Sequence, residues 1–588
     1  MSPAIVMATA YVALLFGGTA LAHRYRHALA ASRWRIHAYG LALAVYCTSW
    51  TYFGAVGSAA TGGWDYLPIY VGPMLLMALG GPFLRRLHLA VHQDGATSIS
   101  DFIGSRFGKS RTVAALVTLI LLFGTIPYIA LQLRSVALSF ALVSGDPESK
   151  AALVGASVVL AAFAITFGAR RYQVAGQNEA ILFAVAFESV LKLAALCLVA
   201  GLALWLMGHA HLPDMAQGLA RFRAGFAMPK LDLDFAVTSI LSMLTIICLP
   251  RHFFISVLEA RRPDDIMRAR WGLVAYLLVT VVAVLPIAAA GTALLNADAK
   301  PDLFVISLPQ HFGFDGLTLL VFLGGLSAAV AMVVTEIVAI SSMISNDLFA
   351  PMMLRRSRGD MHVGERLLWI RRVAIVALIA AATFYAVATP STTQLASVGL
   401  IAFAAIAQCA PALICAVYRT DNDAFAAKAG LTTGFLLWLF LLFLPALSGR
   451  SLALPTLLAD SNPVTVGTLL SLGGNLLAFL LVSARSVGHV RLVRQRGIAP
   501  ITTIDALVEL VARFVGVEAA VEAMGEDGPS HRPVDRASAR TAERVIGSVV
   551  GASSARAIMA SAISGQGLGF AEVAQMLDAS GQSLHFSQ

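Results

Sequence analysis

The chain has 588 residues, of which 58% are hydrophobic and only 13% are charged, and its mean hydropathy is +0.78. A soluble domain is nearer half apolar and a quarter charged, so these proportions exclude a wholly soluble protein and indicate lipid as the main solvent. The net charge of +9 does not indicate nucleic-acid binding, because the basic residues stand between apolar stretches and form no continuous stripe.

Apolar runs follow one another along most of the chain, and each is close to the roughly 20 helical residues needed to cross about 30 Å of hydrocarbon. The predicted fold class is therefore all-α and polytopic, with about thirteen transmembrane helices. The runs cover residues 4–22, 37–58, 66–84, 112–142, 152–169, 178–207, 234–250, 271–296, 316–344, 373–389, 394–418, 429–446 and 464–483.

The charges between these runs predict the orientation of the chain. Lys and Arg collect in short loops on the cytoplasmic side of a membrane, and most of them here, Arg251 among them, follow odd-numbered runs. We therefore expect the N-terminus outside and the C-terminus in the cytoplasm.

The composition changes after Arg485. Residues 485–500 form a short basic linker, and residues 501–588 show amphipathic helical patterns with no strand pattern. Thr503 is expected to cap the first of these helices and Gly516 to end it. Further helices are predicted over 537–550, 555–564 and 570–577, so this region is expected to be a small cytosolic helical bundle, and residues 1–484 a transmembrane domain.

The second apolar run is unusually polar between Tyr46 and Gly57, where hydroxyl and aromatic side chains precede glycines. Transporters place ion and substrate sites at discontinuous helices of this kind. The alternative is that the small polar residues only allow helices to pack closely.

Few ionisable residues lie within the apolar runs, and those that do are candidates for function. Glu188 and Lys192 stand four residues apart, in the order that favours a helical charge pair, and we interpret them as a structural intramembrane pair. Glu336 has no obvious partner in the sequence.

Four motifs in order resemble the sodium/solute symporter family. They are the broken second run, Ala96–Phe102 followed by Arg106-Phe107-Gly108, the segment Tyr128–Leu133, and Ser341-Ser342 followed by Asn346–Phe349. The resemblance covers roughly residues 1–484 and implies two inverted five-helix repeats, formed by runs two to six and seven to eleven, with alternating access. It also implies a central substrate site lined by Thr48, Ser49, Trp50, Thr51, Tyr128 and Gln132. For Trp50 the alternative is a packing role alone.

The sequence departs from the family at the sodium site. The carbonyl ligands of the first core helix correspond to Ala44 and Cys47, and a third carbonyl to Ala328, but the two hydroxyl ligands correspond to Ala331 and Met332. A hard cation needs oxygen ligands, so strict sodium coupling is not expected there. The coupling ion is left open between H⁺ and Na⁺, with no other cofactor and no metal.

Glu336 lies one helical turn beyond Met332 and is therefore the candidate for proton coupling. One alternative is a salt bridge to an arginine from another run, which would hold Glu336 charged and structural. The other is a relocated sodium site that uses Glu336 itself.

The whole chain most resembles the transporter half of symporter-containing sensor histidine kinases of the bacterial inner membrane, in which a helical domain called STAC follows the transporter. Residues 501–588 are similar to that domain. No phosphoacceptor His motif, ATP-lid motif, HExxH or GxSxG is present in residues 1–588, so enzymatic activity is not expected. Either the chain is truncated, or a kinase module acts in trans.

The leading hypothesis is thus a secondary transporter, or a transporter-derived receptor, for a small polar nutrient. Amino acids are the expected substrate class, because some members of the family carry them. The alternative is a non-transporting membrane sensor that serves as the input module of a histidine kinase.

Overall fold

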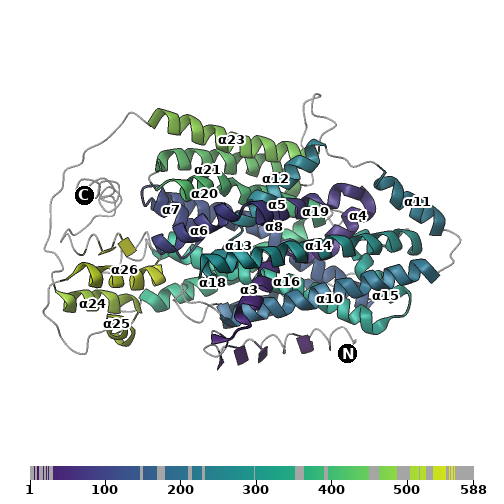
Figure 1. The fold of residues 1–588 in the computed structure, drawn as a ribbon, viewed down its shortest axis with the longest axis horizontal. Coiled ribbons are helices and arrows are strands. Elements are labelled where there is room, and N and C mark those ends of the chain that lie inside the picture. The colour runs from purple at the N-terminus through teal and green to yellow at the C-terminus, as the bar shows by residue number, and fades with distance from the viewer. Residues whose placement is uncertain are drawn as a thin grey trace.

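The computed structural model describes an all-α protein whose long helices run roughly side by side (Figure 1). It describes residues 31–145, 150–168, 179–209, 215–227, 232–296, 298–350, 363–389, 395–420, 422–448, 462–486, 503–515, 517–524 and 534–550, with scattered residues between 6 and 29 and between 555 and 562.

Within these residues, eight helices are long and apolar enough to cross a membrane, or up to ten if each of two bent pairs is one span. The chain is therefore a multi-pass membrane protein with eight to ten candidate spans, fewer than the thirteen expected. Three expected spans account for the difference. Run 4–22 falls mostly outside the described residues, run 37–58 is broken into short pieces, and run 152–169 matches only a shorter apolar helix, Ala151–Thr166.

The first half of the chain alternates long helices with short broken ones. Pro68 begins α5, and Ser110 caps α8 by accepting a hydrogen bond from the Val113 N–H. The elements are α3 (Arg35–Ala42), η1 (Leu43–Tyr46), η2 (Trp50–Gly54), α4 (Ala55–Gly62), η3 (Gly63–Tyr66), α5 (Pro68–Leu79), α6 (Gly81–Asp94), α7 (Ile99–Arg106), α8 (Arg111–Ser144), α9 (Lys150–Phe163), η4 (Ala164–Gly168), α10 (Glu179–His209) and α11 (Met215–Gly225).

The second half begins with another bent helix, because Pro250 interrupts the run that starts at Leu233 and the two parts meet at 55°. Its elements are α12 (Leu233–Cys248), α13 (Pro250–Phe253), η5 (Phe254–Leu258), α14 (Pro263–Leu294), η6 (Pro301–Leu303), α15 (Phe304–His311), α16 (Asp315–Met343), η7 (Ile344–Phe349), α18 (Val363–Ala388), α19 (Leu395–Ile406), η8 (Ala407–Cys409), α20 (Ala410–Tyr418), α21 (Ala424–Trp438), η9 (Leu439–Phe443), α22 (Leu444–Ser448) and α23 (Pro463–Ser486).

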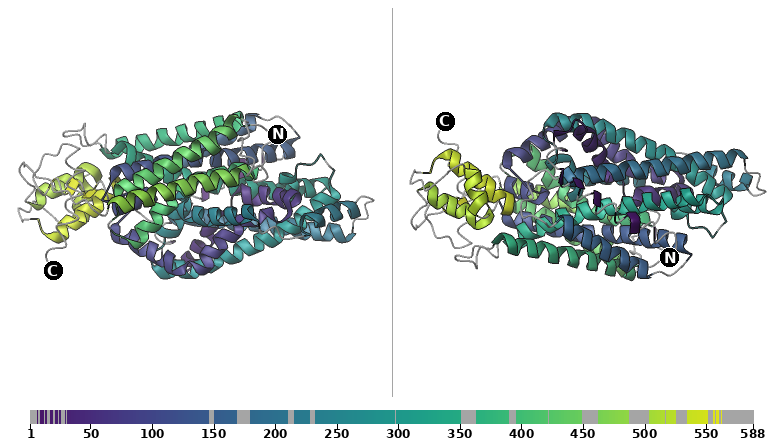
Figure 2. Two further views of the ribbon diagram at one scale, coloured as in Figure 1. Left: turned by 90° about the horizontal axis from the view of Figure 1, so that it is seen from above. Right: turned by 90° about the horizontal axis from the view of Figure 1, so that it is seen from below.

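Three helices near the C-terminus, yellow in Figure 2, pack at one end of the membrane-spanning part. They are α24 (Ile504–Val515), α25 (Val517–Met524) and α26 (Arg536–Val550). Of these, α24 contacts α18 and α26 contacts η7. Their apolar faces form a core around Leu507, Val511 and Ile546, as the amphipathic patterns predict. The helix expected over 570–577 and the stop expected at Gly516 lie outside the described residues.

Candidate functional site

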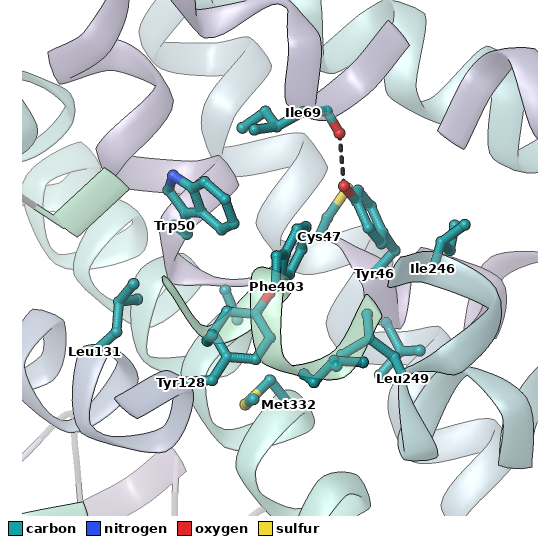
Figure 3. Packing of buried hydrophobic residues seen from close by; sticks show 14 of the residues in the cluster. Tyr46, Cys47, Trp50, Ile69, Tyr128, Leu131, Ile246, Leu249, Met332 and Phe403 are labelled. Carbon is teal, nitrogen blue, oxygen red and sulfur yellow. Dashed lines mark hydrogen bonds between the residues drawn. The ribbon is translucent and has the colours of Figure 1, made fainter. Parts of the chain in front are cut away.

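The candidate site is built on the break in the second apolar run. A 3₁₀-helix ends at Tyr46, Cys47 takes an extended conformation with φ −75° and ψ 109°, and a π-helical turn begins at Trp50. The carbonyls near the break therefore lack a full set of helical partners. The Tyr46 hydroxyl donates to the Ile69 carbonyl at 2.6 Å, which holds the broken segment against α5 (Figure 3).

Aromatic rings from three helices meet beside the break (Figure 3). The ring centroid of Trp50 lies 4.9 Å from that of Phe403 on α19 and 6.4 Å from that of Tyr128 on α8. A Cβ at Gly399 would come within 2.6 Å of the indole, so that glycine makes the room in which Trp50 sits. The ring is thus held in one orientation by its neighbours.

Gln132 connects α8 to the break. Its Oε1 accepts hydrogen bonds from the Ser49 backbone N–H at 3.1 Å and from the Ser49 hydroxyl at 2.6 Å. Because a backbone N–H can only donate, the atom that faces it is the amide oxygen. The amide nitrogen of Gln132 is left buried without a hydrogen-bond partner among the described residues. A donor of this kind is costly unless a ligand or water satisfies it.

Arg251 is a buried residue of the site that the sequence did not predict. The sequence placed it in a cytoplasmic loop, but it lies on α13 with 0% of its side chain exposed and forms a 3.1 Å ion pair with Glu336, also 0% exposed. Its other contacts are the Tyr128 hydroxyl at 3.1 Å and the Val45 carbonyl at 3.4 Å. Glu336 also accepts from the Thr125 hydroxyl at 3.0 Å.

This ion pair bears on the three roles considered for Glu336: proton coupling, a structural salt bridge and a relocated sodium site. The structural alternative, an arginine from another run, is what the structure contains. Its carboxylate accepts hydrogen bonds from a guanidinium, a backbone N–H and a hydroxyl. Glu336 is thus paired in this structure, and its role in proton coupling stays a prediction.

Glu188 and Lys192, which we expected to form an intramembrane charge pair, each hydrogen-bond another partner. The Lys192 ammonium donates to the Ala44 carbonyl at 2.8 Å and to the Cys47 carbonyl at 2.6 Å, whereas Glu188 accepts from the Tyr11 hydroxyl at 2.8 Å. Among the described residues, no ion pair joins the two side chains. The Cys47 carbonyl is available to the ammonium because the extended conformation of Cys47 leaves this carbonyl without a helical N–H donor among the described residues.

The positions on α16 that we expected to correspond to sodium ligands have apolar, buried side chains. Ala328, Ala331 and Met332 are 0%, 3% and 0% exposed, and Met332 lies beside Tyr128 and Phe403 (Figure 3). Of the five positions that correspond to the family's sodium site, only the carbonyls of Ala44 and Cys47 face a cation here, and that cation is Lys192.

The structure brings together five of the six side chains expected to line the substrate site, namely Thr48, Ser49, Trp50, Tyr128 and Gln132. Thr51 instead turns its hydroxyl to the Thr48 carbonyl at 2.9 Å and lines a small cavity beside Lys192. All six are at most 3% exposed, so a substrate reaches this site only when helices move.

Sequence reasoning missed Arg251, Phe403 and His252. Both ring nitrogens of His252 are buried without a hydrogen-bond partner among the described residues. The only available signal was Pro250, which interrupts an apolar run directly before Arg251 and His252, in the way that a glycine-rich break interrupts the second run.

No protein-family model and no curated protein matches this sequence. Among solved structures, the chain is similar to a substrate-bound, outward-open Na⁺-coupled sialic acid symporter, with 12% identity and a TM-score of 0.60 over 83% of this chain and 99% of that one. A manganese transporter of Eremococcus coleocola, in complex with an aromatic bis-isothiourea substituted compound, aligns with 13% identity and a TM-score of 0.43 over 77% of this chain and 94% of that one.

At 12% identity, the likeness to the sialic acid symporter concerns the fold alone. The chain thus has a fold resembling that of a Na⁺-coupled symporter.

Proposed function

We propose that this protein binds a small polar nutrient, an amino acid, at the break between η1 and η2, and carries it across the membrane without free sodium. The observation that carries the proposal is the amide nitrogen of Gln132, a buried donor beside a polar break in a helix that has no hydrogen-bond partner among the described residues. Burying such a donor costs free energy unless a ligand accepts its hydrogen bond.

Amino acids fit this site by chemistry. The carboxylate of an amino acid can accept from the Gln132 amide and from hydroxyls such as that of Thr48, which lies 3.5 Å from the Tyr128 hydroxyl. Its ammonium group is attracted by the face of Trp50, whereas the ring of Tyr128 already lies under the guanidinium of Arg251, 4.7 Å from the ring centroid. The two inverted repeats, α3–α10 and α12–α20, would each begin with a broken helix, and their relative movement would alternate access to the site.

We infer that the C-terminal helices receive a conformational signal from the membrane-spanning part. Ala350 and Leu367, at one end of the membrane-spanning part, share an apolar cluster with Leu507, Val511 and Phe514. This contact supports a STAC-like role for residues 501–588, with basic residues 485–500 as the linker and a kinase module as the partner in cis or in trans.

A polar contact ties the same helices to α6. Arg556 donates to the Asp94 carbonyl at 3.0 Å and forms a 2.6 Å ion pair with Glu543, while the Asp94 carboxylate pairs with Arg106 of α7 at 2.7 Å. Nearby, burial and the charge of Arg556 lower the pKa of Lys109, against the opposing influence of Glu543 and Asp94. Movement of α6 and α7 during transport would therefore reach the bundle directly.

The test is uptake by the purified chain in sealed liposomes, run over a panel of the twenty amino acids with sodium or with choline at constant pH. We expect accumulation of one amino acid or a small group, equal in the two salts. Loss of uptake in choline would contradict sodium independence, and no binding of any amino acid would contradict the substrate class.

A non-transporting sensor is the second candidate, and the docked C-terminal bundle favours it. It predicts saturable amino-acid binding by the detergent-solubilised chain with no accumulation inside liposomes. A measurement of binding and uptake on one preparation therefore separates the two functions.

A further inference from the structure

Two carbonyls at the break of the second run converge on one buried ammonium. Lys192 projects from α10 and donates to the Ala44 carbonyl at 2.8 Å and to the Cys47 carbonyl at 2.6 Å. These distances are typical of charge-assisted hydrogen bonds. Lys192 is 2% exposed, and its nearest acidic neighbour along the helix, Glu188, is bonded to Tyr11 instead.

The local backbone leaves one of the two carbonyls, that of Cys47, in need of such a cation, whereas the Ala44 carbonyl also accepts from the Cys47 N–H at 2.9 Å. Cys47 is extended, so its carbonyl makes no hydrogen bond to a later helical N–H among the bonds of the described residues. In a low-dielectric interior, a carbonyl without a donor is costly. A free metal ion or a tethered ammonium can supply the positive charge, and here the ammonium does.

The surroundings fit a compact cation. A cavity of about 10 Å³ lies against the ammonium and is lined in part by Thr48, Thr51, Tyr276 and Thr280, which is near the smallest volume that holds one water molecule. The cavity therefore leaves room for about one water molecule beside the ammonium.

We propose that Lys192 is a tethered cation that replaces a free coupling cation at the break, and that it holds the broken helix in the shape that binds substrate. Lys192 is thus a positioning residue, since it acts on substrate through the backbone of Ala44 to Cys47. The proposal deepens the proposed function by identifying why free sodium is not required, but its test needs no substrate.

The test compares thermal unfolding midpoints of the purified chain in detergent, in sodium chloride, choline chloride and methylammonium chloride at equal concentration. The native chain should unfold at the same temperature in all three salts. Lys192→Met, which keeps the length of the side chain and removes its charge, should unfold several degrees lower. Lys428→Met, at a half-buried position of α21 away from the break, is the matched control and should change little.

The decisive variant is Lys192→Ala, which leaves a space where a free cation can bind. Methylammonium, but not choline, should reverse at least half of the drop in the unfolding midpoint of this variant, because it reproduces the ammonium that faces the two carbonyls. If methylammonium has no effect beyond that of choline, or if Lys192→Met unfolds like the native chain, Lys192 only fills space and the proposal is wrong.

The unfolding midpoint of the native chain in sodium chloride tests the proposal in a second way. A midpoint of the native chain that rises in sodium chloride relative to choline chloride would show that a free cation binds despite Lys192, and would overturn the replacement. These outcomes are independent of uptake, so failure of the transport assay leaves the role of Lys192 decided by the unfolding data alone.

Discussion

The ion pair between Arg251 and Glu336 predicts a large and non-additive loss of stability when either member is changed. Both side chains are 0% exposed and their charged atoms are 3.1 Å apart. Removing one member of a buried pair leaves an uncompensated charge, at a cost of about 3–5 kcal/mol. We expect Glu336→Gln to lower the free energy of unfolding by about 3 kcal/mol.

Arg251→Met should cost more, about 5 kcal/mol, because Arg251 also donates to the Tyr128 hydroxyl and the Val45 carbonyl. The double variant should lose about 5 kcal/mol rather than the sum of both, which gives a coupling energy of about 3 kcal/mol. Unfolding by sodium dodecyl sulfate in mixed micelles, followed by tryptophan fluorescence, measures all three differences.

Glu188→Gln is the matched control. Glu188 is buried but accepts from the neutral hydroxyl of Tyr11 at 2.8 Å, so its loss should cost only about 1 kcal/mol. If Glu336→Gln is as mild as this control, and its effect simply adds to that of Arg251→Met, Glu336 is not held as a charged partner. Gradient-driven uptake lost with exchange retained in Glu336→Gln would likewise restore its proton-carrying role and refute the argument.

Four further predictions concern substrate binding, pH dependence, the C-terminal helices and membrane topology. Gln132→Leu should weaken amino-acid binding by about tenfold to a hundredfold, since a hydrogen bond to a charged group contributes about 1.5–3 kcal/mol. Gln310→Leu, at an exposed position, is the control. Equal affinities of the native chain and Gln132→Leu in calorimetry would remove Gln132 from the site. Burial raises the pKa of Asp302 from 3.8 to about 6, against opposing effects of Leu395 and Arg134, so the protonated form is favoured in the folded state and its stabilisation is lost as pH rises through 6. Relative to Asp302→Asn, the unfolding midpoint of the native chain should therefore fall between pH 5 and pH 7, and parallel pH profiles would contradict this. Arg556→Ala should raise hydrogen exchange in α24 and α26 by no more than about fivefold, because a half-exposed ion pair contributes at most about 1 kcal/mol, whereas the exposed Arg540→Ala should leave exchange unchanged. Reporter fusions at about residue 495 should be active only as cytoplasmic reporters, and a periplasmic signal would mean that the number of spans between the termini is even where we expect it to be odd.

The sequence was informative about the break because its signal is local. Hydroxyl and aromatic residues followed by glycines within one apolar run are incompatible with a uniform lipid-facing helix, and the structure has a 3₁₀-turn, an extended residue and a π-turn there. The position of the break at Thr48, Ser49 and Trp50 could therefore be predicted from the sequence, whereas Gln132, which contacts Ser49, was expected only from the family resemblance.

The partners of the buried charges could not be predicted in the same way. Helical spacing relates Lys192 to Glu188 on its own helix, but the ammonium reaches carbonyls 145 and 148 residues away in the chain. Likewise, Arg251 at the end of an apolar run has the sequence signature of a cytoplasmic loop, and only its contact with Glu336, 85 residues away, explains its burial. The sequence predicts the location of a charged residue only from its neighbours in the chain, whereas partners far away in the sequence determine whether it is buried.

The two buried cations act on the same few peptide units. Lys192 bonds the carbonyls of Ala44 and Cys47, and Arg251 bonds the carbonyl of Val45 from the opposite half of the chain. Ser49, whose backbone N–H bonds Gln132, is only two residues beyond Cys47. A substrate that accepts from Gln132 would therefore alter a backbone segment that is already held by charges from α10 and α13. Because these helices belong to different halves of the fold, any movement of one half against the other must change at least one of these hydrogen bonds. Substrate binding can therefore bias the direction in which the site opens, because it acts on the same backbone segment.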